Sequence, residues 1–272
     1  MTAQTTTEAG VGATGRARIA ARTLRTDRWW LEPLLTFAGL SAWVLYALVR
    51  TATQRAYFVE KYDYLSPFSS PCVSSSCAKG ARDFGIWFGH FPPFIPFAIL
   101  ILPFLLGFRL TCYYYRKAYY RSFWLSPPAC AVPEPHARYS GETRFPLIFQ
   151  NVHRYFFYAA LIVSVVNSYD AVRAFHGGDG GFGIGLGTLI ILANVVLLWA
   201  YTLSCHSCRH ITGGRLRNFS HHPLRYHAWT FGSKLNVRHM QLAWTTLGTL
   251  MLTDGYIALV SAGAFSDLRI VN

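Results

Sequence analysis

The segment 204–210, Ser-Cys-His-Ser-Cys-Arg-His, holds two cysteines and two histidines directly after a long apolar run. Cys205 and Cys208 are three residues apart, so on a helix both thiols lie on one face, whereas His206 and His210 fall on nearly the opposite face. Thiolates and imidazoles are common protein ligands of zinc and iron. The spacing therefore predicts that the two cysteines form half of a metal site and that other segments supply the rest.

Three apolar segments carry polar or small residues at helical spacing, which marks the side of a membrane helix that faces the interior of a bundle. One end of each stripe is a cysteine pair or a histidine. The stripes are His153-Phe157-Ala160-Ser164-Asn167, Asn194-Leu198-Tyr201-Cys205-Cys208 and His239-Leu242-Thr246-Thr249-Thr253. Cys205, Cys208, His153 and His239 are therefore expected at one depth, all facing inward.

Two thiolates and two imidazoles suit a zinc ion or a Rieske-type [2Fe–2S] cluster, in which one iron takes two cysteines and the other two histidines. A different interpretation uses His153 and His239 alone as the two axial ligands of a b-type haem, with the cysteines as bystanders. Cys112, His206 and His210 remain open as substitute ligands. The residue types favour a metal or haem site inside the membrane.

The elements that position these residues are predicted to be membrane helices. The 272-residue chain is 52% hydrophobic and 14% charged, with a mean hydropathy of +0.25, whereas soluble domains have about 25% charged residues. Its apolar residues gather in blocks of a length that crosses a bilayer as a helix. The predicted spans are 33–49, 91–110, 152–169, 183–208 and 239–262, the last interrupted by Asp254 and Gly255. We expect an all-α, polytopic membrane protein with five transmembrane helices in a bundle.

The basic residues predict the orientation of the chain. Its net charge is +13, and 18 of the 25 Lys and Arg residues lie in the segments 1–30, 109–154 and 209–238. By the positive-inside rule these segments, and so the N-terminus, are cytoplasmic. Topology thus accounts for the basic charge without nucleic acid. We expect a disordered cytoplasmic tail over 1–30, the anchor domain over 31–263 and an extracytoplasmic tail over 264–272.

Cys72 and Cys77 fall on the other side of the membrane in this topology. Disulfides persist in that oxidising compartment, and the surrounding Ser-Pro-Cys-Val-Ser-Ser-Ser-Cys is turn-rich. A disulfide between the two is therefore predicted, with two free thiols as the alternative.

The stretch 111–130, TCYYYRKAYYRSFWLSPPAC, together with the five-span pattern over about 30–262, resembles the membrane-anchor (cytochrome b-like, C) subunit of actinobacterial succinate dehydrogenase or fumarate reductase, respiratory complex II. The resemblance implies a multi-pass protein of the bacterial plasma membrane. Its partners would be an iron–sulfur subunit and a flavoprotein that oxidises succinate in the tricarboxylic acid cycle. Electrons would pass to menaquinone or another quinone, and the loops 109–154 and 209–238 would face the iron–sulfur subunit and anionic lipid headgroups.

Five-helix haem-bearing anchors use two pairs of histidines, and the thiols beside the inner pair favour an iron–sulfur centre here. Tyr226, His227 and Trp229 are candidate quinone-binding residues because they combine hydrogen-bond donors with an aromatic wall, although an interfacial aromatic belt has the same composition. A transporter or channel is the alternative of another class, with the Ser/Thr/Asn stripes lining a path. The lack of a recognisable internal repeat in the sequence weighs against it.

Overall fold

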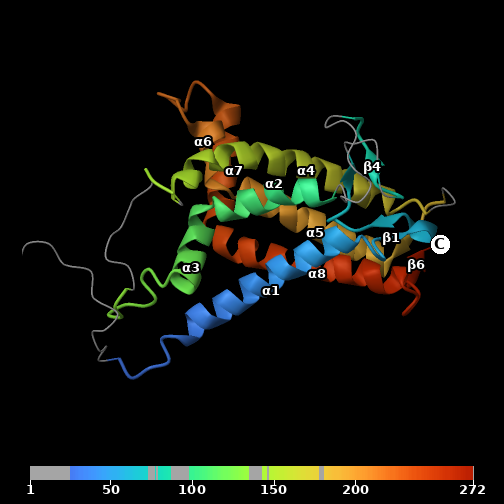
Figure 1. The fold of residues 1–272 in the computed structure, drawn as a ribbon. Coiled ribbons are helices and arrows are strands. Elements are labelled where there is room, and N and C mark those ends of the chain that lie inside the picture. The colour runs from blue at the N-terminus through green and yellow to red at the C-terminus, as the bar shows by residue number, and fades with distance from the viewer. Residues whose placement is uncertain are drawn as a thin grey trace, which may run out of the picture.

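The computed structural model describes residues 25–72, 77, 79–86, 98–134, 143–145, 147–177 and 181–271. Most of these residues are helical, so the predicted all-α class is confirmed. Five helices run side by side in an elongated bundle (Figure 1). They are α1 (Leu31–Thr53), α2 (Ala98–Leu110), α4 (His153–Arg173), α5 (Leu186–Leu203) and α8 (His239–Ser261).

One end of the bundle carries the short helices. These are α3 (Tyr113–Phe123), α6 (His206–Gly213), α7 (Pro223–Asn236) and the 3-10 helix η2 (Leu147–Val152) that leads into α4. The start of the described chain also reaches this end, where Arg25 Nη1 donates to the carbonyl of Cys130 at 2.9 Å. The predicted tail over 1–30 lies outside the described residues up to position 24.

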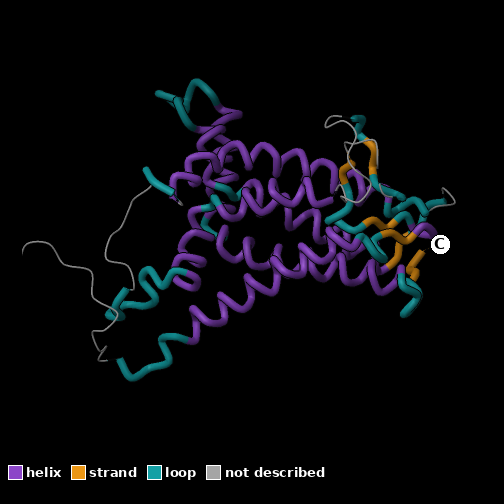
Figure 2. Tube along the Cα trace, in the orientation of Figure 1, coloured by secondary structure: helices purple, strands orange, loops and turns teal. Residues whose placement is uncertain are grey.

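The opposite end carries three small two-stranded sheets (Figure 2). β1 (Phe58–Val59) pairs with β2 (Tyr64–Leu65) around the 3-10 helix η1 (Glu60–Tyr62), β3 (Pro71–Cys72) pairs with β4 (Arg82–Asp83), and β5 (Ile184–Gly185) pairs with β6 (Arg269–Val271). A disulfide joins Cys72 to Cys77 here. The sequence analysis places Cys72 and Cys77 on one side of the membrane and Cys205 and Cys208 on the other. In the structure these two pairs lie at opposite ends of the bundle (Figure 1).

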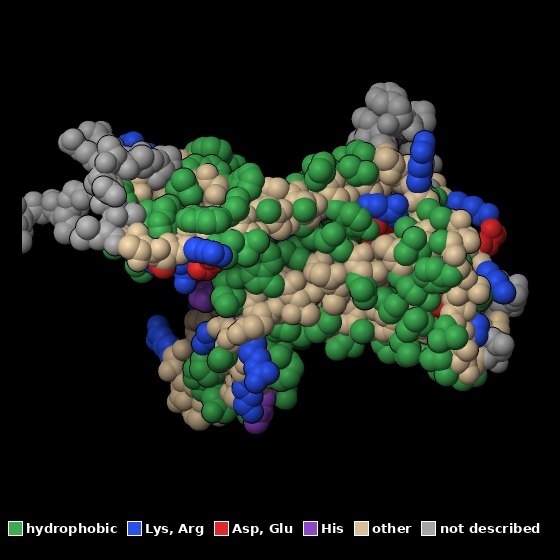
Figure 3. Space-filling view, turned by 90° about the horizontal axis from the view of Figure 1, so that it is seen from below, with side chains coloured by type: hydrophobic (Ala, Val, Ile, Leu, Met, Phe, Trp, Pro, Cys, Tyr) green, Lys and Arg blue, Asp and Glu red, His purple; other side chains and the backbone are tan. Residues whose placement is uncertain are grey.

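The surface supports a membrane location. Hydrophobic side chains cover the length of the bundle, while Lys and Arg gather toward its ends (Figure 3). Within the described residues, three helical segments are long and apolar enough to span a bilayer: α1, η2 with α4, and α5. The bent pair α2 and α3, at 88°, makes up to four. A helix is thus found in each of the five predicted spans, but by length and composition only three or four of the described helical segments qualify as membrane spans. The orientation of the N-terminus stays a prediction.

Two helix boundaries differ from the sequence prediction. The predicted helix over 183–208 ends at Leu203, because Ser204 and Cys205 leave the helix and α6 starts anew at His206. Asp254 and Gly255 do not interrupt α8, which continues to Ser261. The predicted start of the second span, 91–97, lies outside the described residues.

Gly187, in the first turn of α5, lies against the fully buried ring of Tyr64. A Cβ at this position would lie 2.3 Å from Tyr64 Cε2, and the Tyr64 hydroxyl is held at 2.9 Å by both Thr188 and Asp267. We expect Gly187→Ala to lower the free energy of unfolding by about 1–3 kcal/mol, measured by thermal unfolding in detergent. Gly248→Ala in α8 is the control, because its Cβ would meet no atom within 4 Å; equal destabilisation of both variants would contradict this explanation.

Candidate functional site

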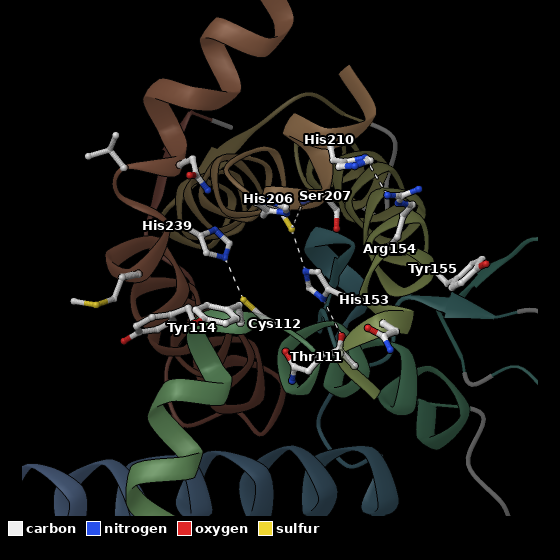
Figure 4. A pocket seen from close by; sticks show the side chains of 17 residues that line it. Thr111, Cys112, Tyr114, His153, Arg154, Tyr155, His206, Ser207, His210 and His239 are labelled. Atoms are coloured by element: carbon white, nitrogen blue, oxygen red, sulfur yellow. Dashed lines mark hydrogen bonds between the residues drawn. The ribbon is translucent and has the colours of Figure 1, made fainter. Parts of the chain in front are cut away.

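A pocket of about 860 Å³ opens at the end of the bundle that carries the short helices (Figure 4). Its walls come from the junction of α2 and α3, the start of α4, the junction of α5 and α6, and the start of α8. The lining residues include Thr111, Cys112, Tyr113, Tyr114, His153, Arg154, Tyr155, Cys205, His206, Ser207, His210, Asn236, His239 and Met240. Three of the four predicted metal ligands are therefore brought together, and Cys112 joins them.

The four donors form two close cysteine–histidine pairs. His153 Nε2 lies 3.1 Å from Cys205 Sγ, and His239 Nε2 lies 3.4 Å from Cys112 Sγ (Figure 4). Cys208 is buried among apolar residues and does not line the pocket. In the described part of the chain, no three or more His, Cys, Asp or Glu residues are arranged to hold one metal ion. The geometry thus offers two pairs of donors rather than a single tight tetrahedron.

A hydroxyl group fixes the tautomer of each histidine. His153 Nδ1 lies 2.8 Å from Thr111 Oγ1, and His239 Nδ1 lies 2.6 Å from Ser204 Oγ. Each hydroxyl donates its one proton to a helix carbonyl at 2.6 Å, so toward the imidazole it acts as an acceptor. Nδ1 therefore carries the proton and Nε2 carries the lone pair, which faces a cysteine sulfur. Metal-binding histidines are commonly oriented by an outer partner in this way.

The two pocket cysteines occupy the same backbone position. Cys112 (φ −66°, ψ 130°) caps the N-terminus of α3, and Cys205 (φ −64°, ψ 143°) caps that of α6. Cys205 Sγ also accepts from the backbone N–H of Ser207 at 3.3 Å. Because helix N-termini carry partial positive charge, both positions stabilise a thiolate.

Burial acts against the thiolate form of Cys205 and also of Cys208, which lies outside the pocket. It raises the pKa of Cys205 to about 12 and also raises the pKa of Cys208. For Cys205 the effect of burial is the larger one and favours the protonated thiol. Metal binding releases such a proton, because the thiolate is the ligand.

The pocket repeats one local arrangement twice. In each copy a hydroxyl residue and a cysteine follow the end of a helix, and the aromatic ring four residues before the cysteine stacks on a histidine that begins a later helix. Each histidine contacts the hydroxyl of its own copy through Nδ1 and the cysteine of the other copy through Nε2. The first copy is Phe108, Thr111, Cys112 and His153; the second is Tyr201, Ser204, Cys205 and His239. This relation exchanges Cys112 with Cys205 and His153 with His239.

Stacked rings form a floor beneath the pocket. Phe108 lies parallel to His153 with their centroids 5.1 Å apart, and Tyr201 lies nearly parallel to His239 at the same distance. Phe108 and Tyr201 contact each other edge to face at 5.5 Å. This packing fixes both imidazole planes and separates the pocket from the interior of the bundle.

The other candidate residues are not among the four paired donors. His206 and His210 line the same pocket, and His210 Nδ1 accepts from Arg154 Nη2 at 2.9 Å. Tyr226, His227 and Trp229 lie on α7 and are not among the residues that line the pocket. Tyr226 and Trp229 stack on each other, with Tyr226 and His227 exposed. The quinone assignment of these three residues therefore stays a prediction.

Comparison with known proteins identifies the family. The profile of the actinobacterial succinate dehydrogenase subunit SdhC matches residues 31–263. Among solved structures, this chain is similar to a chain of the Mycobacterium smegmatis Sdh1 complex in the apo form, with 65% identity, a TM-score of 0.85, and coverage of 97% of this chain and 99% of that chain. A search of curated proteins found no match. The resemblance seen in the sequence is confirmed, and the chain belongs to the actinobacterial SdhC family of succinate dehydrogenase subunits.

Proposed function

We propose that this chain is the membrane anchor of a succinate:quinone oxidoreductase and passes electrons from an iron–sulfur subunit to membrane quinone through a Rieske-type [2Fe–2S] cluster. The SdhC family match over residues 31–263 supports the anchor role. The cysteine–histidine pocket supports the cluster, because it is built at the end of the bundle that carries the basic loops. The neighbouring subunits are the iron–sulfur and flavoprotein subunits of the same complex.

The repeated arrangement in the pocket is the observation that carries the cluster proposal. In a Rieske-type cluster, two cysteines bind one iron and two histidines bind the other. The relation between the two copies makes Cys112 equivalent to Cys205 and His153 equivalent to His239. Like donors are thus related to like donors, which is the pairing that such a cluster requires. We therefore propose these four residues as its ligands, with Cys112 in place of the Cys208 predicted from the sequence.

The residues around the pocket have separate roles. When bound, the cluster would carry one electron at a time at a potential that imidazole ligands raise above that of an all-cysteine cluster. Thr111 and Ser204 hold the histidines with Nε2 free to bind iron. Phe108 and Tyr201 hold the ring planes and keep water of the pocket away from the interior of the bundle.

We place the pocket at the cytoplasmic face. In this topology all five bundle helices cross the membrane, including α8, which packs along α5, and the N-terminus is cytoplasmic. The basic segments 109–154 and 209–238 then border the pocket, where they suit the docking of the iron–sulfur subunit and anionic headgroups. Menaquinone or another quinone would bind nearby, with Tyr226, His227 and Trp229 of α7 as candidates.

The cofactor is tested on the complex purified with its partner subunits. We expect iron and acid-labile sulfide in excess of what the partner subunits hold, and a Rieske-type EPR signal after reduction. A Soret band that belongs to this chain would show haem b on His153 and His239 instead. If this chain is purified without the flavoprotein and iron–sulfur subunits bound to it, the anchor role is contradicted.

The choice between Cys112 and Cys208 gives a matched pair of variants. Cys112→Ala should abolish the Rieske-type signal because it removes the thiol that faces His239 at 3.4 Å. Cys208→Ala should retain the signal, because Cys208 lies outside the pocket. Iron, sulfide and EPR amplitude per complex decide the result. Loss of the signal from Cys208→Ala alone would restore the ligand set predicted from the sequence.

A further inference from the structure

Arg109, near the end of α2, is a buried cation. It is 8% exposed, and its guanidinium donates to the Tyr115 hydroxyl at 2.6 Å, the Ala243 carbonyl at 3.2 Å and Thr246 Oγ1 at 3.1 Å. None of these acceptors is anionic. In the described residues the buried aspartates lie at the far end of the bundle and pair with other arginines, and no ion pair includes Arg109. A buried charge without a counter-charge is unfavourable, so a function is the default explanation.

Arg109 lies directly beneath the aromatic floor of the pocket. Its guanidinium carbon is 4.8 Å from the centroid of Tyr201, whose ring stacks on His239. The preceding residue, Phe108, stacks on His153. The charge is thus separated from His239, one of the two proposed histidine ligands, by the single ring of Tyr201.

A small cavity of about 40 Å³ shares this position below the floor. Arg109, Phe108 and Tyr201 form one side, and Ser164, Asn167 and Thr202 supply polar groups on the others. The Tyr201 hydroxyl is buried there without a hydrogen-bond partner among the described residues. The cavity has room for one or two waters, but its described lining holds no anion to neutralise the guanidinium.

The two copies of the pocket arrangement differ at this point. Arg109 precedes Cys112 by three residues, and the residue in the same place before Cys205 is the neutral Thr202. The positive charge therefore occurs in only one of the two copies, whereas the aromatic, hydroxyl, cysteine and histidine residues occur in both. The described lining below the floor holds no anion, whereas above it two cysteine thiolates would hold the cluster.

We propose that Arg109 is a positioning residue for electron transfer, whose fixed positive charge raises the reduction potential of the cluster above it. Reduction of the cluster adds one electron and therefore one negative charge, with no bond broken and no proton required. A fixed cation stabilises the reduced form more than the oxidised form, and the low-dielectric surroundings screen it little. This inference rests on the proposed function of the pocket.

The test is a redox titration of the purified complex followed by EPR, with iron and sulfide content measured first. The variants are two neutral ones, Arg109→Gln and Arg109→Met, and the charge-conserving Arg109→Lys. At the midpoint potential of the unchanged protein, the reduced-to-oxidised ratio should fall at least tenfold in a neutral variant, which corresponds to a shift of 59 mV for one electron. The ratio in Arg109→Lys should stay within threefold, as should that in Thr246→Val, which removes a neutral contact.

Three results would overturn the proposal. The first is an unchanged midpoint in a neutral variant that contains the cluster. The second is an equal shift in Arg109→Lys and Arg109→Gln, which would indicate a role for shape and not charge. The third is loss of iron from both neutral variants with retention in Arg109→Lys, which would assign Arg109 to assembly of the site. If the unchanged complex itself lacks iron and sulfide in this chain, the proposed function fails before this test begins.

Discussion

A complex that carries His153→Ala is expected to lose iron and acid-labile sulfide from the anchor and to reduce quinone more than about 100-fold slower. Loss of an outer partner of a metal ligand alone typically lowers metal affinity or activity by about 10- to 100-fold, and His153 would be a ligand itself. Its Nε2 lies 3.1 Å from Cys205 Sγ and its Nδ1 is fixed by Thr111. Succinate oxidation with a water-soluble dye should persist, because that chemistry belongs to the partner subunits.

His210→Ala is the matched control for this prediction. His210 lines the same pocket and also contacts a neighbour through Nδ1, but that neighbour is Arg154 and not a residue that orients a ligand. The variant should keep the cluster and most of the quinone reductase activity. Retention of iron in His153→Ala together with its loss in His210→Ala would move the site to the outer part of the pocket.

Helical periodicity predicted the histidines correctly as inward-facing residues at one depth. His153 and His239 each begin a long helix, so the stripe of small and polar residues beneath them reports the buried face of α4 and α8. Ser164, Asn167, Thr246 and other members of those stripes are buried as expected. Where a helix is continuous, the spacing of polar and small residues therefore predicts which side chains point into the bundle.

The expectation that Cys205 and Cys208 share one helix face is wrong, because the helix is not continuous. Periodicity places Cys205 and Cys208 on one face only if the helix runs through both, yet Cys205 adopts ψ 143° and caps a new helix. No proline or glycine marks this break. A signal was present in two of the four hydroxyl–cysteine dipeptides of the chain: Thr111-Cys112 and Ser204-Cys205 directly follow an apolar run. The sequence does not make the repeat evident, because the spacing from cysteine to histidine differs between the two copies.

The far end of the bundle depends on contacts that local patterns do not report. Three buried aspartates there are paired with arginines from distant segments. The ion pairs are Arg50–Asp254, Arg82–Asp63, Arg82–Asp170 and Arg173–Asp63. The sequence shows Asp254 as an isolated carboxylate within a span, which predicts an interruption of the helix at Asp254 and Gly255. Only the fold shows that α1 supplies its counter-charge.

Asp254→Leu is expected to destabilise the anchor by about 3–5 kcal/mol, because it leaves Arg50 buried without its counter-charge. The Asp254 side chain is 1% exposed and that of Arg50 15%. Arg50 contacts both carboxylate oxygens, Nε to Oδ2 at 2.5 Å and Nη2 to Oδ1 at 3.0 Å. Tyr46 and Ser66 donate to the same carboxylate at 2.5 Å. Thermal unfolding of the detergent-solubilised complex should show the effect as a lower unfolding temperature.

A double variant without either charge shows how much of the destabilisation comes from leaving one ion buried alone, and how much comes from losing the ion pair itself. Two buried charges that are replaced together by apolar side chains of similar size often leave stability unchanged or raise it. The double variant Arg50→Met with Asp254→Leu should therefore recover most of the stability that Asp254→Leu loses, in spite of the lost bonds to Tyr46 and Ser66. Additive losses in the double variant would mean that each residue stabilises the bundle independently. Since Asp254 lies at the end of α8 opposite His239, the cluster signal should remain in every variant that assembles, so loss of stability and loss of electron transfer can be told apart.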